Sequence, residues 1–393
     1  MTSRTRVLFT IGSLGCGGSE RQLLNILSRL DRTCFEPHLY LLDRSGEFLA
    51  DVPSDVPVTA FSDVRQPGGS SLPGTTFRRQ IAHLTQHLCA GKFDVVYERT
   101  FLMPPLTGPA AKASGIPRIS TVTADPERDL ANNLQRFTWI KKKLLGRALR
   151  NAAGVVGVSD GVRRAAERFY GLTPETTRTI YNGFDIEHIR CRAAEPCPLD
   201  LPGGSDAFRI AYVGRLQREK GLDILLKAMR IAIHERGLGH LRLIVAGDGP
   251  DSESLQALVK DLRLEEQVVF TGFVQNPYAI VSRCQLLCLP SRYEGMPNTL
   301  VEGLALGIPV IASNCPHGPQ EILDGEQLGE LVTPESEAAL ATAIERAVAR
   351  TPDESAARAR KHSVEQRFSI ERCVAELEQF LTDVTGTQGK GGA

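Results

Sequence analysis

Two series of short apolar segments, separated by a stretch rich in proline and glycine, constrain the fold of this chain more than any other feature. In the first series each segment is bounded by Gly, Pro or Asp and has the length of a buried strand, at 7–11, 37–42, 94–97, 118–122 and 154–158. Between them, residues 20–30 and 77–88 carry apolar side chains at helical spacing. This alternation predicts a doubly wound α/β sheet.

The pattern stops and then starts again. Residues 190–206 are rich in Pro and Gly and have little periodicity, which predicts an interdomain linker. After it, strands are expected at 209–213, 242–246, 268–271, 286–289 and 309–312, with helices at 221–233, 252–261, 299–305 and 337–349. We therefore expect an N-terminal domain over 1–189 and a C-terminal domain over 207–368. A last helix over 369–385 is predicted to cross back to the first domain, and 386–393 to be a disordered tail.

Composition narrows the class of protein. A chain of 393 residues suits two domains of common size. Lys plus Arg and Asp plus Glu number 46 each, so no net field favours nucleic acid, and no nucleic-acid partner is expected. The nine cysteines show no metal-binding spacing and no signal-like segment precedes them, which predicts reduced, buried thiols in the cytoplasm. No apolar run approaches the roughly 20 residues of a membrane-spanning helix.

The first motif is a glycine-rich loop between a predicted strand and helix. Glycines at 12, 15, 17 and 18 precede Glu20 and Arg21, and the amides of such a loop can hold a phosphate or approach a sugar. The spacing fits the dinucleotide pattern GxGxxG poorly, so a nicotinamide-dependent oxidoreductase is a weak alternative. The glycines at 17 and 18 can equally serve a tight turn alone.

The second motif follows the first strand of the second series. In the segment 213–221, Arg215 offers a planar fork and Lys220 a compact charge, and both can oppose the charge on a leaving nucleoside diphosphate. The alternative is an ordinary surface ion pair with Glu219 or Asp223.

The third motif, at 291–303, is the most specific. Pro297 suits the first position of a helix, so residues 295–299 present free backbone N–H groups to an anion. Glu294 lies in the loop before this helix and Glu302 about one turn inside it, where each carboxylate can accept hydroxyl hydrogen bonds. The alternative is that both glutamates are ordinary loop and helix charges.

These motifs, in this order, resemble the retaining glycosyltransferase family 4, whose members have the GT-B fold. The matching residues are Gly-Gly-x-Glu-Arg at 17–21, Gly-Arg at 214–215 with a glycine at 221, and Glu-x7-Glu at 294–302. Similar pieces occur at 158–159, 182–185, 246–250 and 318–322. The resemblance covers nearly the whole chain and implies an α/β protein of two Rossmann-like doubly wound domains facing a central cleft. It also implies that 1–189 is the acceptor-side domain and that 207–368 binds the donor nucleotide sugar.

The resemblance also implies roles for individual residues. Arg215 and Lys220 would bind the donor diphosphate, and Glu302 the ribose. Glu294 would contact the donor sugar with the amides of Gly295 and Met296, so the catalytic candidates are Glu294, Arg215 and Lys220. The other donor-binding candidates are Gly17, Gly18, Asn182, Gly214, Pro297, Asn298 and Thr299.

The activity implied is transfer, with retention, of a hexose or N-acetylhexosamine from a nucleotide sugar to a saccharide. We expect a UDP-linked donor and an acceptor that is free or lipid-linked, in cell-surface polysaccharide or glycolipid assembly. No Asp-x-Asp occurs, which agrees with an enzyme that needs no metal and no cofactor. Many relatives carry a histidine where this chain has Thr123-Ala124-Asp125, so a catalytically silent sugar-nucleotide-binding relative is the alternative.

A basic, amphipathic segment at 136–150 contains the single tryptophan of the chain. Such a helix can rest on anionic lipid headgroups, peripherally on the inner face of the cytoplasmic membrane, and bring the site to a lipid-linked saccharide. The competing interpretation is a surface helix whose Trp139, Ile140, Leu144 and Leu145 face the core, with solvated lysines opposite.

Overall fold

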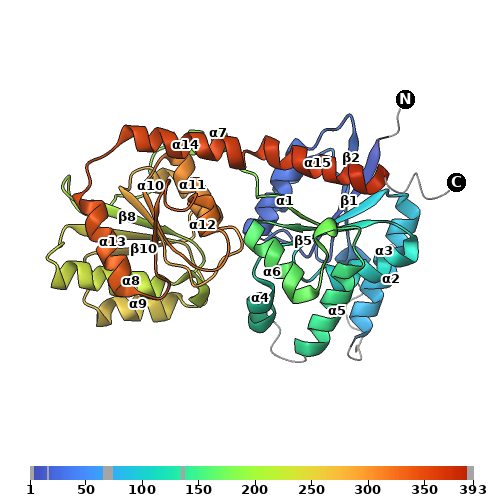
Figure 1. Ribbon diagram of the computed structural model, residues 1–393, viewed down its shortest axis with the longest axis horizontal. Coiled ribbons are helices and arrows are strands. Elements are labelled where there is room, and N and C mark those ends of the chain that lie inside the picture. The colour runs from blue at the N-terminus through green and yellow to red at the C-terminus, as the bar shows by residue number, and fades with distance from the viewer. Residues whose placement is uncertain (1–3, 16, 65–73, 134–137, 387–393) are drawn as a thin grey trace. The chain divides into compact units, whose positions relative to one another are not determined.

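The computed structural model describes residues 4–15, 17–64, 74–133 and 138–386, which form two compact units (Figure 1). The first unit extends to Phe184 and resumes at Ile370, and the second runs from Asp185 to Ser369. Each unit is an α/β domain built on one parallel sheet.

The first unit contains a seven-stranded sheet in the order β3-β2-β1-β4-β5-β6-β7, and every neighbouring pair is parallel. The order reverses at β1, and the carboxyl ends of β1 and β4 lie next to each other at this switch point, where open α/β sheets bind ligands. The strands are β1 Thr5–Ile11, β2 Phe35–Leu41, β3 Val58–Ala60, β4 Val95–Arg99, β5 Arg118–Val122, β6 Gly154–Gly157 and β7 Thr177–Thr179.

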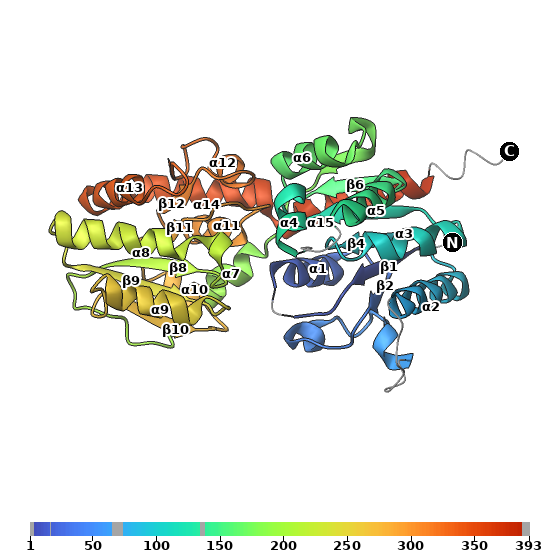
Figure 2. The ribbon, with the colours of Figure 1, turned by 90° about the horizontal axis from the view of Figure 1, so that it is seen from below.

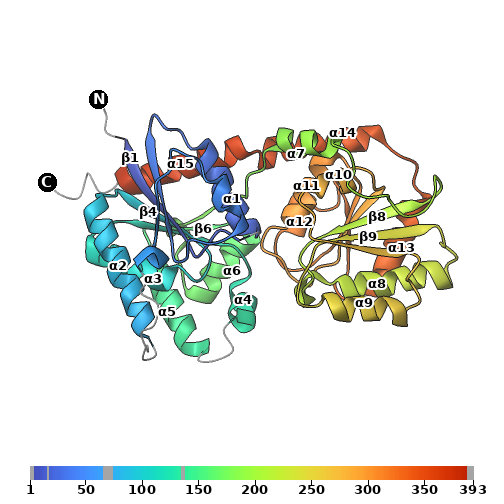
Figure 3. The ribbon, with the colours of Figure 1, turned by 180° about the vertical axis from the view of Figure 1, so that it is seen from behind.

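Helices cover both faces of this sheet. One face packs against α1 and α15 in the largest apolar cluster of the unit, and the other against α2, α3, α5 and α6. Figure 3 shows α15 on one side of the strands and α2, α3 and α5 on the other. The helices are α1 Gly18–Arg29, α2 Thr75–Gly91, α3 Pro104–Ser114, α4 Pro126–Asn133, α5 Thr138–Arg150, α6 Asp160–Tyr170 and α15 Ile370–Gly386, with short 3-10 turns at Glu47–Asp51, Phe61–Val64 and Pro174–Thr176.

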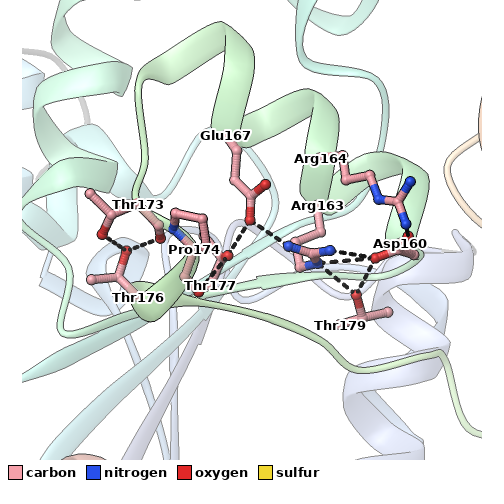
Figure 4. A network of polar contacts seen from close by, with 9 residues as sticks. All are labelled: Asp160, Arg163, Arg164, Glu167, Thr173, Pro174, Thr176, Thr177 and Thr179. Carbon is pink, nitrogen blue, oxygen red and sulfur yellow. Dashed lines mark hydrogen bonds and ion pairs between the residues drawn. The ribbon is translucent and has the colours of Figure 1, made fainter.

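A polar network joins α6 to the edge strand β7 (Figure 4). The Arg163 guanidinium donates to Asp160 Oδ1 at 2.6 Å, to Glu167 Oε1 at 2.5 Å and to the Thr179 hydroxyl at 3.1 Å. Thr177 also donates to Glu167. These contacts fix the short strand that leads to Asn182.

The second unit contains a six-stranded sheet in the order β10-β9-β8-β11-β12-β13, again with every neighbouring pair parallel. Its switch point lies between β8 and β11, so the segments that follow these two strands meet at one edge. The strands are β8 Phe208–Val213, β9 Leu241–Ala246, β10 Val268–Gly272, β11 Leu286–Leu289, β12 Val310–Ser313 and β13 Glu330–Val332.

One face of the second sheet packs against α8, α9 and α13, and α8 and α9 lie side by side in Figure 2. The helices α7, α10, α11 and α14 pack against one another in the same unit. The bounds are α7 Ile186–Ala194, α8 Leu222–Arg230, α9 Ser252–Asp261, α10 Tyr278–Val281, α11 Asn298–Leu306, α12 Pro319–Ile322, α13 Glu337–Ala349 and α14 Glu354–Phe368, with a 3-10 turn at Arg218–Lys220 and a π-helical turn at Ile231–Glu235.

The structure changes two sequence predictions. The second unit begins at Asp185, so the boundary between the units lies before the predicted linker 190–206. Helix α7 packs on α10 and α11 and brings residues 186–194 into the second unit. The cysteines are not all buried: among those described, Cys34, Cys89 and Cys191 are exposed, and each described cysteine is a free thiol. The predicted tail lies outside the described residues beyond Gly386.

Candidate functional site

The centre of the candidate site in the second unit is an ion pair between Lys220 and Glu294. The Lys220 ammonium donates to both carboxylate oxygens, at 2.7 Å to Oε1 and 2.9 Å to Oε2. The Ser291 hydroxyl donates to Oε1 at 2.7 Å. The Glu294 side chain is 7% exposed and that of Lys220 is 28% exposed. The structure therefore brings together two of the three predicted catalytic residues. Three hydrogen bonds hold the Glu294 carboxylate in place.

Lys220 reaches this position because its loop packs directly on the end of β11. Gly221 has φ +67°, and a Cβ there would lie 2.1 Å from the carbonyl oxygen of Pro290, so only glycine allows the approach. The backbone amide of Arg292 donates to the Glu219 carbonyl at 2.8 Å. The segments after β8 and β11 are thus joined through their backbones.

The side chain of Arg292 also connects the segments that follow β8 and β11. Its guanidinium makes two parallel hydrogen bonds of 2.8 Å to the Asp223 carboxylate, and it donates to Glu335 at 2.9 Å. Burial alone would raise the pKa of Asp223, but the hydrogen bond and charge of Arg292 outweigh it and lower that pKa. The hydrogen bond to Asp223 in turn raises the pKa of Arg292. Sequence reasoning left Arg292 and Ser291 without roles, although both lie inside the third motif.

Arg215 stands at the carboxyl end of β8 as an exposed cation. Within the part of the chain that the structure describes, its guanidinium forms no ion pair, so the predicted alternative of a surface pair with Glu219 or Asp223 is wrong. Its backbone carbonyl accepts a 3.4 Å hydrogen bond from the Tyr212 hydroxyl. Burial, with the charge of Glu294 nearby, raises the pKa of Tyr212, which keeps this phenol protonated.

Glycines allow a second close approach beneath this loop. Gly214 donates its amide to the Ala246 carbonyl at 3.0 Å. A Cβ on Gly247, which has φ +145°, would lie 2.0 Å from the Gly214 carbonyl oxygen, and one on Gly249 would lie 2.3 Å from that of Leu216. The segment 246–249 therefore packs against the backbone of the loop after β8 and holds Gly214 and Arg215 in place.

Helix α11 begins at Asn298, one residue before the predicted range 299–305, and Pro297 lies just before it rather than at its first position. The Thr299 hydroxyl donates to the Val213 carbonyl at 3.2 Å, which ties the first turn of the helix to the end of β8. The loop before the helix, with Gly295 and Met296 buried in it, packs against Gly318, where a Cβ would meet Pro297 Cδ at 2.5 Å. These contacts fix the backbone from which α11 presents its N-terminal amides.

Glu302 lies one turn into α11 and accepts a 3.2 Å hydrogen bond from the Tyr278 hydroxyl of α10. Glu294 accepts hydrogen bonds from Lys220 and Ser291, whereas Glu302 accepts one from Tyr278. Tyr278 was missed by sequence reasoning because it lies outside the three motifs.

The remaining candidates lie in the first unit. Helix α1 starts at Gly18, and Gly17 precedes it without a side-chain cap. Gln22 of this helix accepts the Gly183 amide at 3.0 Å, and Asn182 accepts a 2.6 Å hydrogen bond from Arg99. The glycine-rich loop and the segment 182–183 are thus joined through α1. Neither Arg99 nor Gln22 was singled out from the sequence.

Two family profiles match the chain. The profile described as Glycosyltransferase Family 4 matches residues 16–188, and the profile described as Glycosyl transferases group 1 matches residues 207–350. The chain is a family 4 glycosyltransferase of the GT-B type. The resemblance seen in its three motifs is thereby confirmed.

Similar proteins share this assignment. This glycosyltransferase is 27% identical over 333 residues to the N-acetylgalactosamine-N,N'-diacetylbacillosaminyl-diphospho-undecaprenol 4-alpha-N-acetylgalactosaminyltransferase of Campylobacter jejuni, covering 83% of this chain and 86% of the relative. It is 28% identical over 200 residues to the lipopolysaccharide 1,6-galactosyltransferase of Escherichia coli K12, covering 49% of this chain and only about half, 52%, of that relative.

The fold has a solved counterpart. The crystal structure of Anabaena HepE in complex with UDP matches with a TM-score of 0.77 at 20% identity, covering 96% of this chain and 100% of HepE. HepE has also been solved with UDP-glucose. At this identity the likeness establishes the GT-B fold, with its two Rossmann-like units, and the predicted fold class is confirmed.

Proposed function

We propose that this protein is a retaining glycosyltransferase that moves a hexose or N-acetylhexosamine from a UDP-sugar to a saccharide acceptor, lipid-linked in its natural setting. The observation that carries the proposal is the Lys220–Glu294 pair, at 2.7 and 2.9 Å, with the exposed cation of Arg215 in the same segment after β8 as Lys220. A fixed carboxylate suits sugar hydroxyls, and fixed cations suit a leaving diphosphate.

Each of the site residues has a separate role in the proposed transfer reaction. Glu294, held by Lys220 and Ser291, keeps an orientation in which its free lone pairs accept hydrogen bonds from donor hydroxyls. Lys220 and Arg215 oppose the negative charge that grows on the diphosphate as the glycosidic bond breaks. The N-terminal amides of α11 suit the same anion. The donor-binding residues here are Gly295, Met296 and Pro297, which precede the helix, and Asn298 and Thr299, which begin it. Glu302 takes the nucleotide ribose, and Gly17, Gly18, Asn182 and Gly214 allow close approach to the donor.

The choice of donor and acceptor draws on the relatives. HepE binds UDP and UDP-glucose, and the Campylobacter enzyme acts, by its name, on a diphospho-undecaprenol saccharide. Galactosyltransferases of lipopolysaccharide assembly are also among the relatives. These support a UDP-linked hexose, a lipid-linked saccharide and a role in cell-surface polysaccharide assembly.

We propose that catalysis needs no metal and no cofactor. Arg215 and Lys220 supply two positive charges that can oppose the charge of a leaving diphosphate, the role that a divalent ion has in metal-dependent enzymes. Turnover in the presence of a strong chelator tests this directly. Loss of activity on chelation, restored by a divalent ion, would contradict it.

The first experiment is a calorimetric titration with UDP, GDP, ADP and NAD in metal-free buffer. We expect saturable binding of UDP, weakened in Lys220→Ala and unchanged in Lys361→Ala, a control lysine on α14 of the same unit. Binding of NAD alone, or equal UDP affinity in Lys220→Ala, would overturn the site assignment.

A catalytically silent relative is the second candidate, and one observation favours it. Many relatives carry a histidine where this chain has Thr123-Ala124-Asp125, and in this segment Asp125 accepts the amides of Glu127 and Arg128 at 3.0 Å and caps α4. This candidate predicts UDP-sugar binding without transfer or hydrolysis over a broad acceptor panel. Release of UDP by the wild-type protein, abolished in Glu294→Gln, would exclude it.

We propose that the basic segment 136–150 contacts anionic membrane on the cytoplasmic side. Residues 136 and 137 lie outside the described residues, as do the side chains of Trp139 and Ile140. In the described part of α5, Leu145 is buried but Leu144 is 50% exposed, so the expectation that Leu144 faces the core is wrong. No helix in the described residues is both long and apolar enough to cross a membrane.

A groove of about 740 Å³ beside α5 supports this proposal. Among the described residues, three cations without a buried counter-ion line it, together with the exposed Phe77 and Leu144; they are Lys112, Arg147 and Arg150. Arg118 also lines the groove, but it is buried and paired with Glu98. Co-sedimentation with phosphatidylglycerol vesicles, but not phosphatidylcholine vesicles, is expected to be lost in Arg147→Glu and kept in Arg358→Glu on α14. Equal binding in both variants would refute it.

A further inference from the structure

Among the described residues of the first unit, Arg99 and Arg118 are the buried arginines, and of these two Arg118 alone has a counter-ion. Arg118 on β5 and Arg99 on β4 are both 3% exposed. Arg118 forms an ion pair with Glu98, which also accepts from Ser120 and Thr107. Among the described residues no carboxylate lies within ion-pair distance of Arg99. A guanidinium keeps its charge at every physiological pH, so Arg99 is a permanent buried cation.

The hydrogen-bond partners of Arg99 among the described residues are neutral groups. Its Nη2 donates to the Asn182 side-chain oxygen at 2.6 Å, its Nη1 reaches the Tyr97 hydroxyl at 3.4 Å, and its Nε has no partner. Cys373 of α15 is also close enough to feel the charge, but burial raises the pKa of this thiol to about 12 and keeps it protonated. A buried cation without a counter-charge is strongly unfavourable, which marks the position as unusual.

Two further observations point to the same edge of the sheet. Arg99 pairs in register with Thr121 on β5, so their side chains leave the same face of the sheet. The Thr121 hydroxyl is buried and also lacks a partner. The next residue after Arg99, Thr100, has φ +79°, a conformation that a β-branched residue rarely adopts and that is concentrated at binding sites.

We propose that Arg99 and Thr121 form a binding site for a phosphate-type oxyanion at the carboxyl edge of β4 and β5. The anion would accept hydrogen bonds from the Arg99 Nε–H and the Thr121 hydroxyl. These two donors at the site have no hydrogen-bond partner among the described residues. The Nη groups would continue to hold Asn182. The ligand supplies the missing charge, and the site needs no change in the protonation of any residue.

The identity of the ligand rests on the proposed function. A saccharide acceptor that carries a phosphate or diphosphate presents such an oxyanion, whereas a neutral saccharide does not. The site would therefore select acceptors that bear a phosphoryl group. Anion binding itself does not depend on turnover, so it can be tested apart from the transferase activity.

The test measures thermal unfolding of the full chain with inorganic phosphate, glucose 1-phosphate and acetate, in the wild type and in an Arg215→Ala, Lys220→Ala background that lacks both proposed donor-site cations. We expect both phosphates to raise the unfolding temperature in both backgrounds, and glucose 1-phosphate at lower concentration. A response to inorganic phosphate alone would contradict the acceptor assignment. An equal response to acetate would contradict a phosphate-type ligand.

Matched variants separate a ligand site from a structural role. Thr121→Val removes an unpartnered hydroxyl, so it should fold normally and lose at least tenfold in phosphate affinity. Thr10→Val is the control, since Thr10 is equally buried and unpartnered but is in register with Glu98, on the opposite face. Unchanged affinity in Thr121→Val, or the same loss in Thr10→Val, would overturn the proposal.

The stability of arginine variants gives an independent readout. Arg99→Met removes an uncompensated charge, so the anion-free protein should unfold at the same or a higher temperature, and the shift on adding phosphate should disappear. Arg118→Met leaves Glu98 unpaired and should unfold at a lower temperature while it keeps the phosphate shift. If Arg99→Met instead loses stability as Arg118→Met does and still responds to phosphate, Arg99 is a structural residue.

Discussion

Replacing Lys220 by methionine tests the central ion pair, because methionine keeps most of the apolar stem and removes the ammonium. In the structure this ammonium lies 2.7 and 2.9 Å from the two oxygens of Glu294, whose side chain is 7% exposed. Hydrogen bonds to charged groups contribute about 1.5–3 kcal/mol, and Ser291 remains as a partner of Glu294, so we expect stability to fall by about that amount. Loss of one preorganised charge should lower kcat by about 10²–10³-fold.

The assay combines donor turnover, UDP affinity and urea unfolding for Lys220→Met, Glu294→Gln and the double variant. Because the two groups touch, the effects on stability should not add, with a coupling of about 0.5–3 kcal/mol. Ser291→Ala is the control that weakens the orientation of Glu294 without removing a charge, and it should lose less kcat than Lys220→Met. Wild-type kcat in a folded Lys220→Met protein would refute the electrostatic argument.

Three other changes have defined outcomes. Arg118→Met should lower the free energy of unfolding by about 3–5 kcal/mol in a urea titration, because it leaves the fully buried Glu98 without its partner; a loss below 1 kcal/mol would show that the pair is not needed. Gly247→Ala should weaken UDP binding in calorimetry and cost about 1–3 kcal/mol of stability, since its Cβ would lie 2.0 Å from the Gly214 carbonyl oxygen; unaltered UDP affinity would contradict this. The folded-state pKa of Asp223 lies below its ordinary value of 3.8, so its contribution to stability is present above that pH and is lost as the pH falls through the lowered pKa; urea midpoints of Asp223→Asn from neutral to acid pH should show a smaller acid-induced loss than the wild type, and identical slopes would refute it.

Long, strongly patterned elements were predictable because their pattern is local. Strands β5 and β11 and helices α9 and α13 have the predicted bounds, since an apolar run or a 3.6-residue period is present within each segment. The three-residue strands β3, β7 and β13 were missed. Each lies at a sheet edge, is paired on one side only, and is too short to show a period.

Helix α14 was missed for another reason. It is highly polar, and Val364 and Phe368 are its buried residues, so its apolar pattern is weak. Its start has a readable signal, because Asp353 accepts the amides of Ser355 and Ala356 at 2.8 and 3.1 Å. Packing against α11 then provides stability that the sequence pattern does not reveal.

The sequence by itself determined the two doubly wound units and the residue types of the site. Glycine where the chain must turn tightly, cations after a strand and carboxylates beside a helix start are local features, and local features can be read along the chain. Only the tertiary structure decided which of them meet. Lys220 and Glu294 form a pair because β8 and β11 are neighbours at the switch point, and Arg99 lacks a counter-ion because no carboxylate among the described residues of its unit reaches it. Pairing between distant segments depends on strand order, and strand order is a property of the folded chain.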